Sequence, residues 1–176
     1  MALIAPLAEE QLDAESRERI AAGMASGMYT TTLPLRIMAR APAALRSMDE
    51  GYKAMFHCSL LDDRLRELLR LQSAILNGCG PCSVSRKEDA VGEEEIACLA
   101  DPDAAGSTRR ERLALRYMTL MATDHFKITA DTYRELAEEF SAAEIVELGW
   151  TCASTIGGHR FIHSLDVLGD SMPVIR

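Results

Sequence analysis

The sequence predicts an all-α protein, and three features support that fold class. Almost every segment has apolar residues at helical spacing rather than in the alternation of a strand. Residues that begin and end helices recur between these segments. The composition, with 48% hydrophobic and 26% charged residues over 176 positions, is that of a globular domain large enough to bury its own core.

The first half of the chain is expected to form four helices. Residues 8–25 have a helical pattern, and Pro42 marks the start of the next helix because proline favours the first helical position. Asp62 is the expected N-cap of a third helix, which ends at Asn77-Gly78 because glycine readily adopts the left-handed conformation found after helices. A fourth helix is predicted from about Cys79 to Val91.

The second half contains clear start signals. EEEIACLA is expected to form a short helix, since its acidic residues favour the positive end of the helix dipole. Residues 101–107 (DPDAAGS) form the clearest loop. Thr108 with Glu111, and Ser141 with Glu144, each match a capping box. The remaining helices are predicted at 108–123, 130–140 and 142–168, which makes seven or eight in total and no strand.

Charge and composition exclude several classes of function. The net charge of -8 and the pI near 5.0 argue against nucleic-acid binding, which needs a basic face. The segment MALIAPLAEEQLDAESRERI has neither the charged and apolar regions of a signal peptide nor a spanning helix, so we expect a cytoplasmic protein. No phosphate-binding, flavin or nicotinamide motif is visible, and no cofactor is expected.

The most informative motif is NGCGPC, which places Cys79 and Cys82 two residues apart. Zinc is one interpretation, but a structural zinc site needs four ligands. Cys98 and Cys152 stand singly in the sequence. His159 and His163 lie at i,i+4 and share a helical face, so a metal site is conceivable there. Without a clear third ligand, the sequence predicts no metal site.

CGPC is also the active-site sequence of thioredoxin. That fold requires a strand before the motif, whereas LRELLRLQSAIL has helical periodicity and good helix formers. Redox chemistry on a helical scaffold remains. The amino end of a helix stabilises a thiolate, and a second cysteine one turn away can close a disulfide. The alternative is a pair of unreactive buried thiols.

The sequence around this motif resembles a known superfamily. From about residue 45 to 170 it is similar to the carboxymuconolactone decarboxylase superfamily, in its alkylhydroperoxidase D-like, peroxidase-related branch. The segments that carry the resemblance are RELLRLQSAILNGCGPC, AVGEEEIACL and FSAAEIVELGWTCASTIGGHRFIHSLDVLG. The resemblance implies a single all-α domain at 1–176, with a helical extension at 1–40 and a core at 41–170, which assembles into dimers, trimers or hexamers.

The resemblance also implies roles for particular residues. The family motif has a glutamate, eleven intervening residues and a CxxC pair, then three residues and a histidine. Glu67, Cys79 and Cys82 occupy the first three places. Cys82 corresponds to the peroxidatic cysteine and Cys79 to its partner, while the glutamate and histidine form a proton relay. An external dithiol would return the electrons.

The histidine of the family motif is replaced by Arg86. Histidine exchanges a proton near neutral pH, whereas a guanidinium stays protonated, so Arg86 can hold a thiolate but cannot relay protons. If the Cys79–Val91 helix folds back along the preceding one, Glu67 and Arg86 become nearly level. We therefore predict an ion pair between Glu67 and Arg86. The alternative is that Arg86 points into solvent.

The remaining histidines are weak candidates to replace the missing one. His57 and His125 fit structural roles in or near apolar helices. His159 and Arg160 stand where relatives commonly have an Asn-Arg pair, and Arg160 is expected to form a structural or interface ion pair. Because single histidines are commonly structural, the sequence favours neither His159 nor His163 as the proton carrier.

The function predicted is a thiol-dependent oxidoreductase of peroxidase or disulfide-reductase type. Cys82, Cys79, Glu67 and Arg86 form its candidate catalytic site, and a hydroperoxide or a protein disulfide is its substrate. The loss of the histidine shifts the expectation towards a slow peroxidase or a disulfide reductase. Two alternatives remain: a non-redox lactone decarboxylase-like enzyme, and a catalytically idle oligomeric binding protein.

Overall fold

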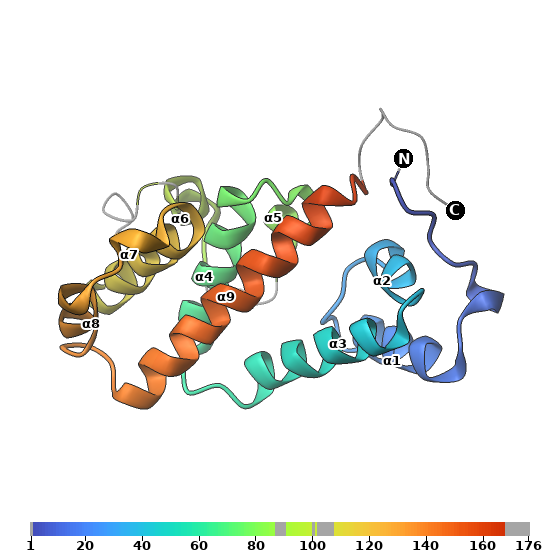
Figure 1. The fold of residues 1–176 in the computed structure, drawn as a ribbon, viewed down its shortest axis with the longest axis horizontal. Coiled ribbons are helices and arrows are strands. Elements are labelled where there is room, and N and C mark those ends of the chain that lie inside the picture. The colour runs from blue at the N-terminus through green and yellow to red at the C-terminus, as the bar shows by residue number, and fades with distance from the viewer. Residues whose placement is uncertain (1, 87–90, 100, 102–107, 168–176) are drawn as a thin grey trace. The chain divides into compact units, whose positions relative to one another are not determined.

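The computed structural model describes residues 2–86, 91–99, 101 and 108–167, and it is all-α over these residues (Figure 1). The chain divides into two compact units. Unit 1 comprises residues 1–58 and 162–176, and unit 2 comprises residues 59–161. The sequence predicts a core that begins at residue 41, whereas the structure groups residues 41–58 with the N-terminal segment.

Unit 1 contains a short 3-10 turn and three helices: Glu9–Gln11, α1 at Ala14–Ala25, α2 at Leu33–Met38 and α3 at Pro42–His57. The side chain of Asp13 caps α1, and Pro42 begins α3 as predicted. The helix expected over 8–25 is therefore interrupted at Leu12, which has an extended backbone. The sequence does not predict α2, because six residues are too few to show a helical period.

A buried carboxylate ties α1 to α3 in unit 1. Asp49 on α3 is completely buried. It lies 2.8 Å from Arg19 on α1, 2.8 Å from Lys53 and 3.0 Å from the hydroxyl of Tyr29. Since a buried charge is costly unless it is paired and hydrogen-bonded, this network is what allows Asp49 to face the interior.

Unit 2 contains the helices that surround the cysteine motif. They are α4 at Asp63–Leu76, α5 at Gly80–Val84, α6 at Glu93–Cys98, α7 at Arg109–Thr123, α8 at Ala130–Leu136 and most of α9, which spans Ala142–Ser164, with a 3-10 turn at His125–Lys127. Asp62 caps α4, Thr108 and Glu111 form the predicted capping box of α7, and Ser141 and Glu144 bond reciprocally at the start of α9. These local signals are confirmed.

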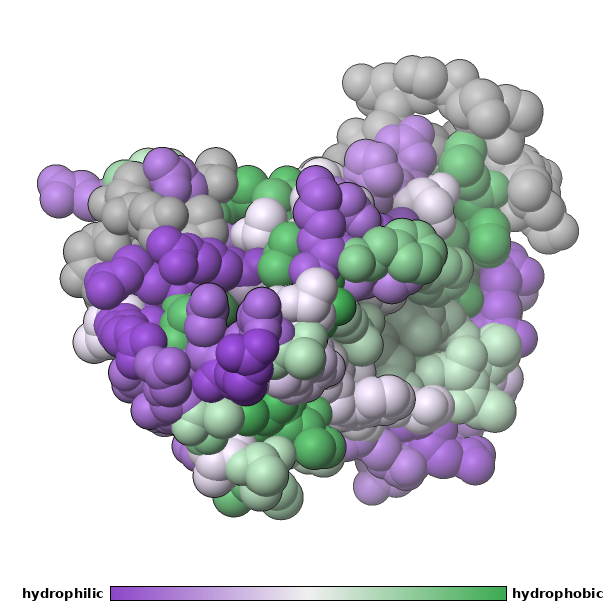
Figure 2. Space-filling model, turned by 60° about the vertical axis from the view of Figure 1, so that its left-hand side comes forward, coloured by the Kyte–Doolittle hydropathy of each residue, from purple (hydrophilic) through white to green (hydrophobic). Residues whose placement is uncertain are grey.

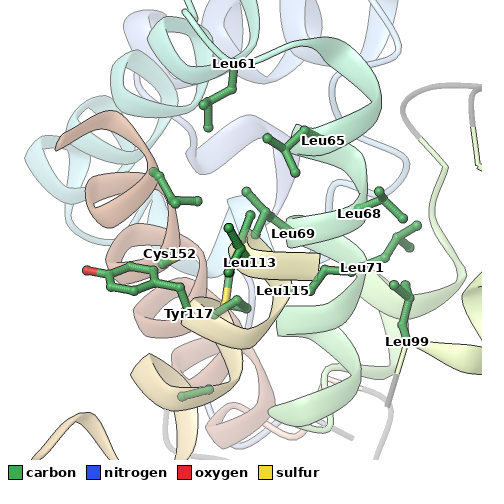
Figure 3. Close-up of a cluster of buried hydrophobic side chains, with 14 of the residues drawn as sticks. Leu61, Leu65, Leu68, Leu69, Leu71, Leu99, Leu113, Leu115, Tyr117 and Cys152 are labelled. Atoms are coloured by element: carbon green, nitrogen blue, oxygen red, sulfur yellow. The ribbon is translucent and has the colours of Figure 1, made fainter. Parts of the chain in front are cut away.

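The core of unit 2 lies between α4, α7 and α9. Figure 3 shows leucines of α4 facing side chains of α7, with Cys152 of α9 beside them. Leu65, Leu69 and Leu115 are fully buried, and α4 is buried over most of its length. A helix buried on nearly every side gives its few polar residues little access to water, so each needs an internal partner.

The helix predicted from Cys79 to Val91 is wrong in length. α5 ends at Val84, and Ser85 has an extended backbone with φ -74° and ψ 136°. Residues 87–90 lie outside the described residues, as does most of the predicted loop at 101–107. In place of a long second helix, α5 is a short helix that ends in an extended backbone at Ser85.

Both polar and apolar side chains reach the surface of the protein. Figure 2 shows an area of hydrophilic residues on one face, with hydrophobic residues gathered beside it. In unit 2, Val146 and Trp150 of α9 are among the exposed large hydrophobic residues. None of the described helices has the length and apolar character that crossing a membrane requires.

We predict that the cap of α4 stabilises the protein measurably. The side chain of Asp62 accepts a hydrogen bond from the N–H of Leu65 at 2.9 Å. Asp62→Ala should lower the free energy of unfolding by about 1 kcal/mol, measured by denaturant titration, because this N–H loses its partner. Asp62→Asn keeps an acceptor and should lose much less. Equal losses in the two variants would contradict the capping role.

Candidate functional site

A stripe of polar residues runs along the otherwise leucine-rich helix α4. Glu67, Arg70 and Ser73 are spaced by three residues, and Asn77 follows four residues later, so all four share one helical face. The first three are buried. Polar groups in this position are costly unless they are satisfied, so the stripe marks the place where α4 serves something other than packing.

Glu67 and Arg70 form a buried ion pair. The Nε of Arg70 lies 2.8 Å from one carboxylate oxygen of Glu67, and its Nη2 lies 2.6 Å from the other. The two side chains are 0% and 2% exposed. The planar guanidinium thus meets the carboxylate with two parallel bonds, the geometry that best offsets the loss of hydration.

The same guanidinium holds the segment that contains the second cysteine. Nη1 of Arg70 donates to the carbonyl oxygen of Cys82 at 2.8 Å, and Nη2 donates to that of Ser85 at 2.6 Å. These two carbonyls lie at the end of α5, where the short helix leaves its own acceptors unused. Arg70 therefore fixes the end of α5 against α4.

The first cysteine is anchored one turn further along α4. Gly78 has a φ of 64°, which reverses the chain, and the N–H of Cys79 then donates to the carbonyl oxygen of Ala74 at 2.9 Å. The carbonyl of Cys79 accepts from the N–H of Ser83 at 2.9 Å and closes the first turn of α5. Cys79 is buried at 1% exposure, whereas Cys82 is partly exposed.

The predicted ion pair between Glu67 and Arg86 is wrong. Arg70 occupies both oxygens of Glu67, while Arg86 pairs with Glu93 at the start of α6 at 2.9 Å. Arg86 also donates to the carbonyl oxygen of Ser83 at 2.8 Å. The physical reason is that each charge has a nearer partner: Arg70 lies three residues from Glu67 on the same helix, and Arg86, just past the end of α5, meets Glu93.

Two residues of α9 contact the end of the polar stripe. Nδ1 of His159 lies 2.9 Å from the hydroxyl of Ser73, and Nε of Arg160 donates to the side-chain oxygen of Asn77 at 2.7 Å. Arg160 also bonds the carbonyl oxygen of Ala122 at the end of α7. The ion pair expected of Arg160 stays a prediction; the bonds that the structure gives this residue connect α9 to the ends of α4 and α7.

The environment of His159 keeps its imidazole neutral. The side chain is 7% exposed, and burial together with the positive charge of Arg70 lowers its pKa to about 4. Both causes disfavour the charged form, the burial more strongly. The sequence does not show whether His159 reaches the motif, and the structure places it on the same face of α4 as Arg70.

The other cysteines have different surroundings. Cys152 is fully buried in the core of unit 2, and burial raises the pKa of its thiol far above the usual range, so it is a packing residue. Cys58 is exposed and Cys98 is half-buried. Within the described parts of the chain, no three or more His, Cys, Asp or Glu side chains are grouped so that they could hold a metal ion.

Sequence reasoning missed Arg70, Ser73 and Asn77. The signal was present, because polar residues at intervals of three or four in a leucine-rich helix must find partners inside the protein. Arg70 follows Glu67 by three residues, a spacing that favours an ion pair on one helix. By that rule the nearby Arg70 is a better partner for Glu67 than the distant Arg86.

Comparison with known structures identifies the fold. An uncharacterised peroxidase-related protein from Ralstonia eutropha JMP134, with an alkylhydroperoxidase D (AhpD) core, aligns with a TM-score of 0.78 at 15% identity, over 94% of this chain and 90% of that one. The chain has the alkylhydroperoxidase D-like fold. The predicted fold class is thereby confirmed. Comparison with protein-family models and with curated sequences gives no match.

Two further structures share this alkylhydroperoxidase D-like fold. The debrominase Bmp8 aligns with a TM-score of 0.77 at 18% identity, over 93% of this chain and 90% of its own. A protein of unknown function from Agrobacterium tumefaciens, related by name to the antioxidant defence protein AhpD, aligns with a TM-score of 0.62 at 21% identity. That alignment covers 78% of this chain and 96% of the other. At these identities the likeness concerns the fold.

The assignment of the ion pairs Glu67–Arg70 and Arg86–Glu93 can be tested through the stability of variants. Glu67→Gln leaves Arg70 as an uncompensated buried charge and should lower the free energy of unfolding by about 3–5 kcal/mol. The matched variant Glu93→Gln breaks the surface pair with Arg86 and should cost about 1 kcal/mol or less. Chemical denaturation followed by far-ultraviolet circular dichroism gives both values. A Glu93→Gln loss as large as that of Glu67→Gln would show that the pairs are wrongly assigned.

The neutral state of His159 predicts a pH dependence of stability. Its pKa is about 4 when folded and 6.5 when unfolded, so the unfolded chain binds the proton more tightly. The stability advantage of wild type over His159→Asn should therefore be complete above pH 6.5 and shrink by about 3 kcal/mol towards pH 4. Denaturant titrations at several pH values measure this difference. A difference that is constant with pH would contradict it.

Proposed function

We propose that this chain is a thiol-dependent oxidoreductase that reduces a hydroperoxide or a disulfide with the Cys79–Cys82 pair. One observation carries the proposal. The two thiols occupy one helical turn, both are anchored to α4, and one is accessible while the other is buried. Cys82 is thus suited to meet a substrate, and Cys79 to react only with Cys82.

The spacing of the two cysteines allows a disulfide. Residues three apart on a helical turn have Cα atoms about 5 Å apart, within the roughly 4.4–6.8 Å range of protein disulfides. The hydrogen bond from Ser83 to Cys79 indicates that this turn is formed. The two sulfurs can therefore join without unfolding α4 or the core behind it.

The electrostatic support for a thiolate comes from a side chain rather than from the helix. α5 has five residues, and the dipole of so short a helix contributes little. The guanidinium of Arg70, by contrast, is bonded to the carbonyl of Cys82 itself. A fixed positive charge beside a cysteine favours its thiolate, although Glu67 offsets part of this charge.

The proposed reaction balances with a hydroperoxide as the oxidant. The Cys82 thiolate attacks the terminal peroxide oxygen and the O–O bond breaks. The alkoxide that leaves takes up a proton and becomes an alcohol. The resulting sulfenic acid reacts with the Cys79 thiol to give a disulfide and water. Two electrons have then passed from the thiols to the peroxide, and an external dithiol restores the pair by exchange.

The names of the similar structures support this class of substrate. One is called peroxidase-related and another is related to an antioxidant defence protein, which favours a peroxide. The third is a debrominase, so a brominated organic compound is a further oxidant to test. A decarboxylase-like enzyme or a binding protein would need neither thiol, and alkylation of both cysteines separates these alternatives from the redox function.

We predict that the two cysteine variants differ in how much peroxide they consume. Cys82→Ser should abolish the consumption of tert-butyl hydroperoxide in the presence of dithiothreitol, because the attacking sulfur is lost. Without dithiothreitol, Cys79→Ser should still reduce one equivalent and accumulate a sulfenic acid on Cys82, since the resolving thiol is gone. Trapping with dimedone and mass spectrometry locates this product.

Cys98→Ser is the matched control, because Cys98 is also partly exposed but stands singly in the sequence. It should retain the full peroxide consumption of the wild type. Peroxide consumption that survives in Cys82→Ser, or a wild type that consumes neither peroxide nor disulfide, would overturn the proposed function.

A further inference from the structure

Ser73 stands on α4 between the two residues that bond the main chain of the cysteines. Along α4, Arg70 holds the carbonyl of Cys82, and Ala74 holds the N–H of Cys79. Ser73 stands between these two residues and is completely buried. Its hydroxyl contacts Nδ1 of His159 at 2.9 Å, which brings an imidazole from α9 to this part of α4.

His159 is the neutral titratable group of this buried cluster. Arg70 is a permanent cation, and both oxygens of Glu67 are already engaged by it. Arg86, at the place where the resemblance expects a histidine, is bonded to Glu93. His159 is nine-tenths buried, and its Nε2 has no hydrogen-bond partner among the residues that the structure describes.

We propose that His159, oriented by Ser73, carries the proton of the Cys79–Cys82 pair and takes the place of the histidine that Arg86 replaces. With Nδ1–H donated to the hydroxyl of Ser73, Nε2 is left as the acceptor. This inference rests on the proposed function, because without a reaction at Cys82 there is no proton to carry. It makes His159 a residue of the site that the sequence did not favour.

The proton balance of the proposed step is simple. Nε2 accepts the proton that the Cys82 thiol releases, and it returns this proton to the alkoxide that leaves when the O–O bond breaks. No net proton is gained or lost by the imidazole. The negative charge of the Cys82 thiolate favours an imidazolium, against the opposing effect of Arg70.

The charged groups around His159 define what a pH profile would report. Arg70 and Glu67 face this region from α4, and Arg160 is the next residue on α9. The two arginines keep their charge over the working range, and Glu67 is held in its ion pair. Because the pKa of His159 is about 4, its imidazole is neutral in the resting protein throughout the range from pH 5 to 9.

The test compares two reactions of Cys82 that differ in their need for a proton. Reduction of tert-butyl hydroperoxide must protonate the leaving alkoxide, whereas alkylation by iodoacetamide releases iodide and needs no proton. In His159→Asn, which keeps a side chain able to bond Ser73, the peroxide rate should fall by about 100-fold or more. The iodoacetamide rate at pH 9 should stay at the wild-type value, and His163→Asn on the same helix should keep both rates.

Each other outcome overturns the inference in a recognisable way. If His159→Asn keeps the peroxide rate, another group carries the proton. If both rates fall together, His159 only supports the structure around Cys82. If wild-type Cys82 does not react with the peroxide, as shown by an equal result for Cys82→Ser, the proposed function fails and the role of His159 with it.

Discussion

The buried ion pair between Glu67 and Arg70 is the interaction on which the rest of the site depends. It is enclosed within unit 2 with both partners almost fully buried. Such a pair contributes little net stability, because desolvation offsets most of the attraction. Its effect is positional: with Glu67 holding one edge of the guanidinium, the other donors of Arg70 point at the carbonyls of Cys82 and Ser85.

The two faces of α4 have different roles. Its leucines pack against α7 and α9 and supply the apolar burial that stabilises unit 2. Its polar face, from Glu67 to Asn77, instead binds the main chain of the cysteine motif and the side chains of His159 and Arg160. Because the leucine face fixes the helix rigidly, the polar face can hold both thiols in one arrangement without relying on the short α5.

Local sequence signals predicted the helices well and the site only in part. The caps at Asp62 and Thr108 were foreseen, because a capping residue bonds a group only three positions away. The partner of Glu67 was missed although its signal was also local, because the family motif drew attention to position 86 and away from Arg70, three residues along the same helix. Ser73 and His159 are 86 positions apart, and no local pattern relates them.

The clamp formed by Arg70 also limits how the CGPC tetrapeptide could be transplanted. Four of the five guanidinium hydrogens are directed at three different residues, whereas a lysine ammonium at this place is a single point with three donors. In a thioredoxin-like scaffold the motif begins a long helix. Here Arg70 and Ala74 of the preceding helix, α4, hold the main chain of the motif in place. Grafting these four residues into another helical bundle would therefore transfer the cysteines without the α4 residues that bond their main chain.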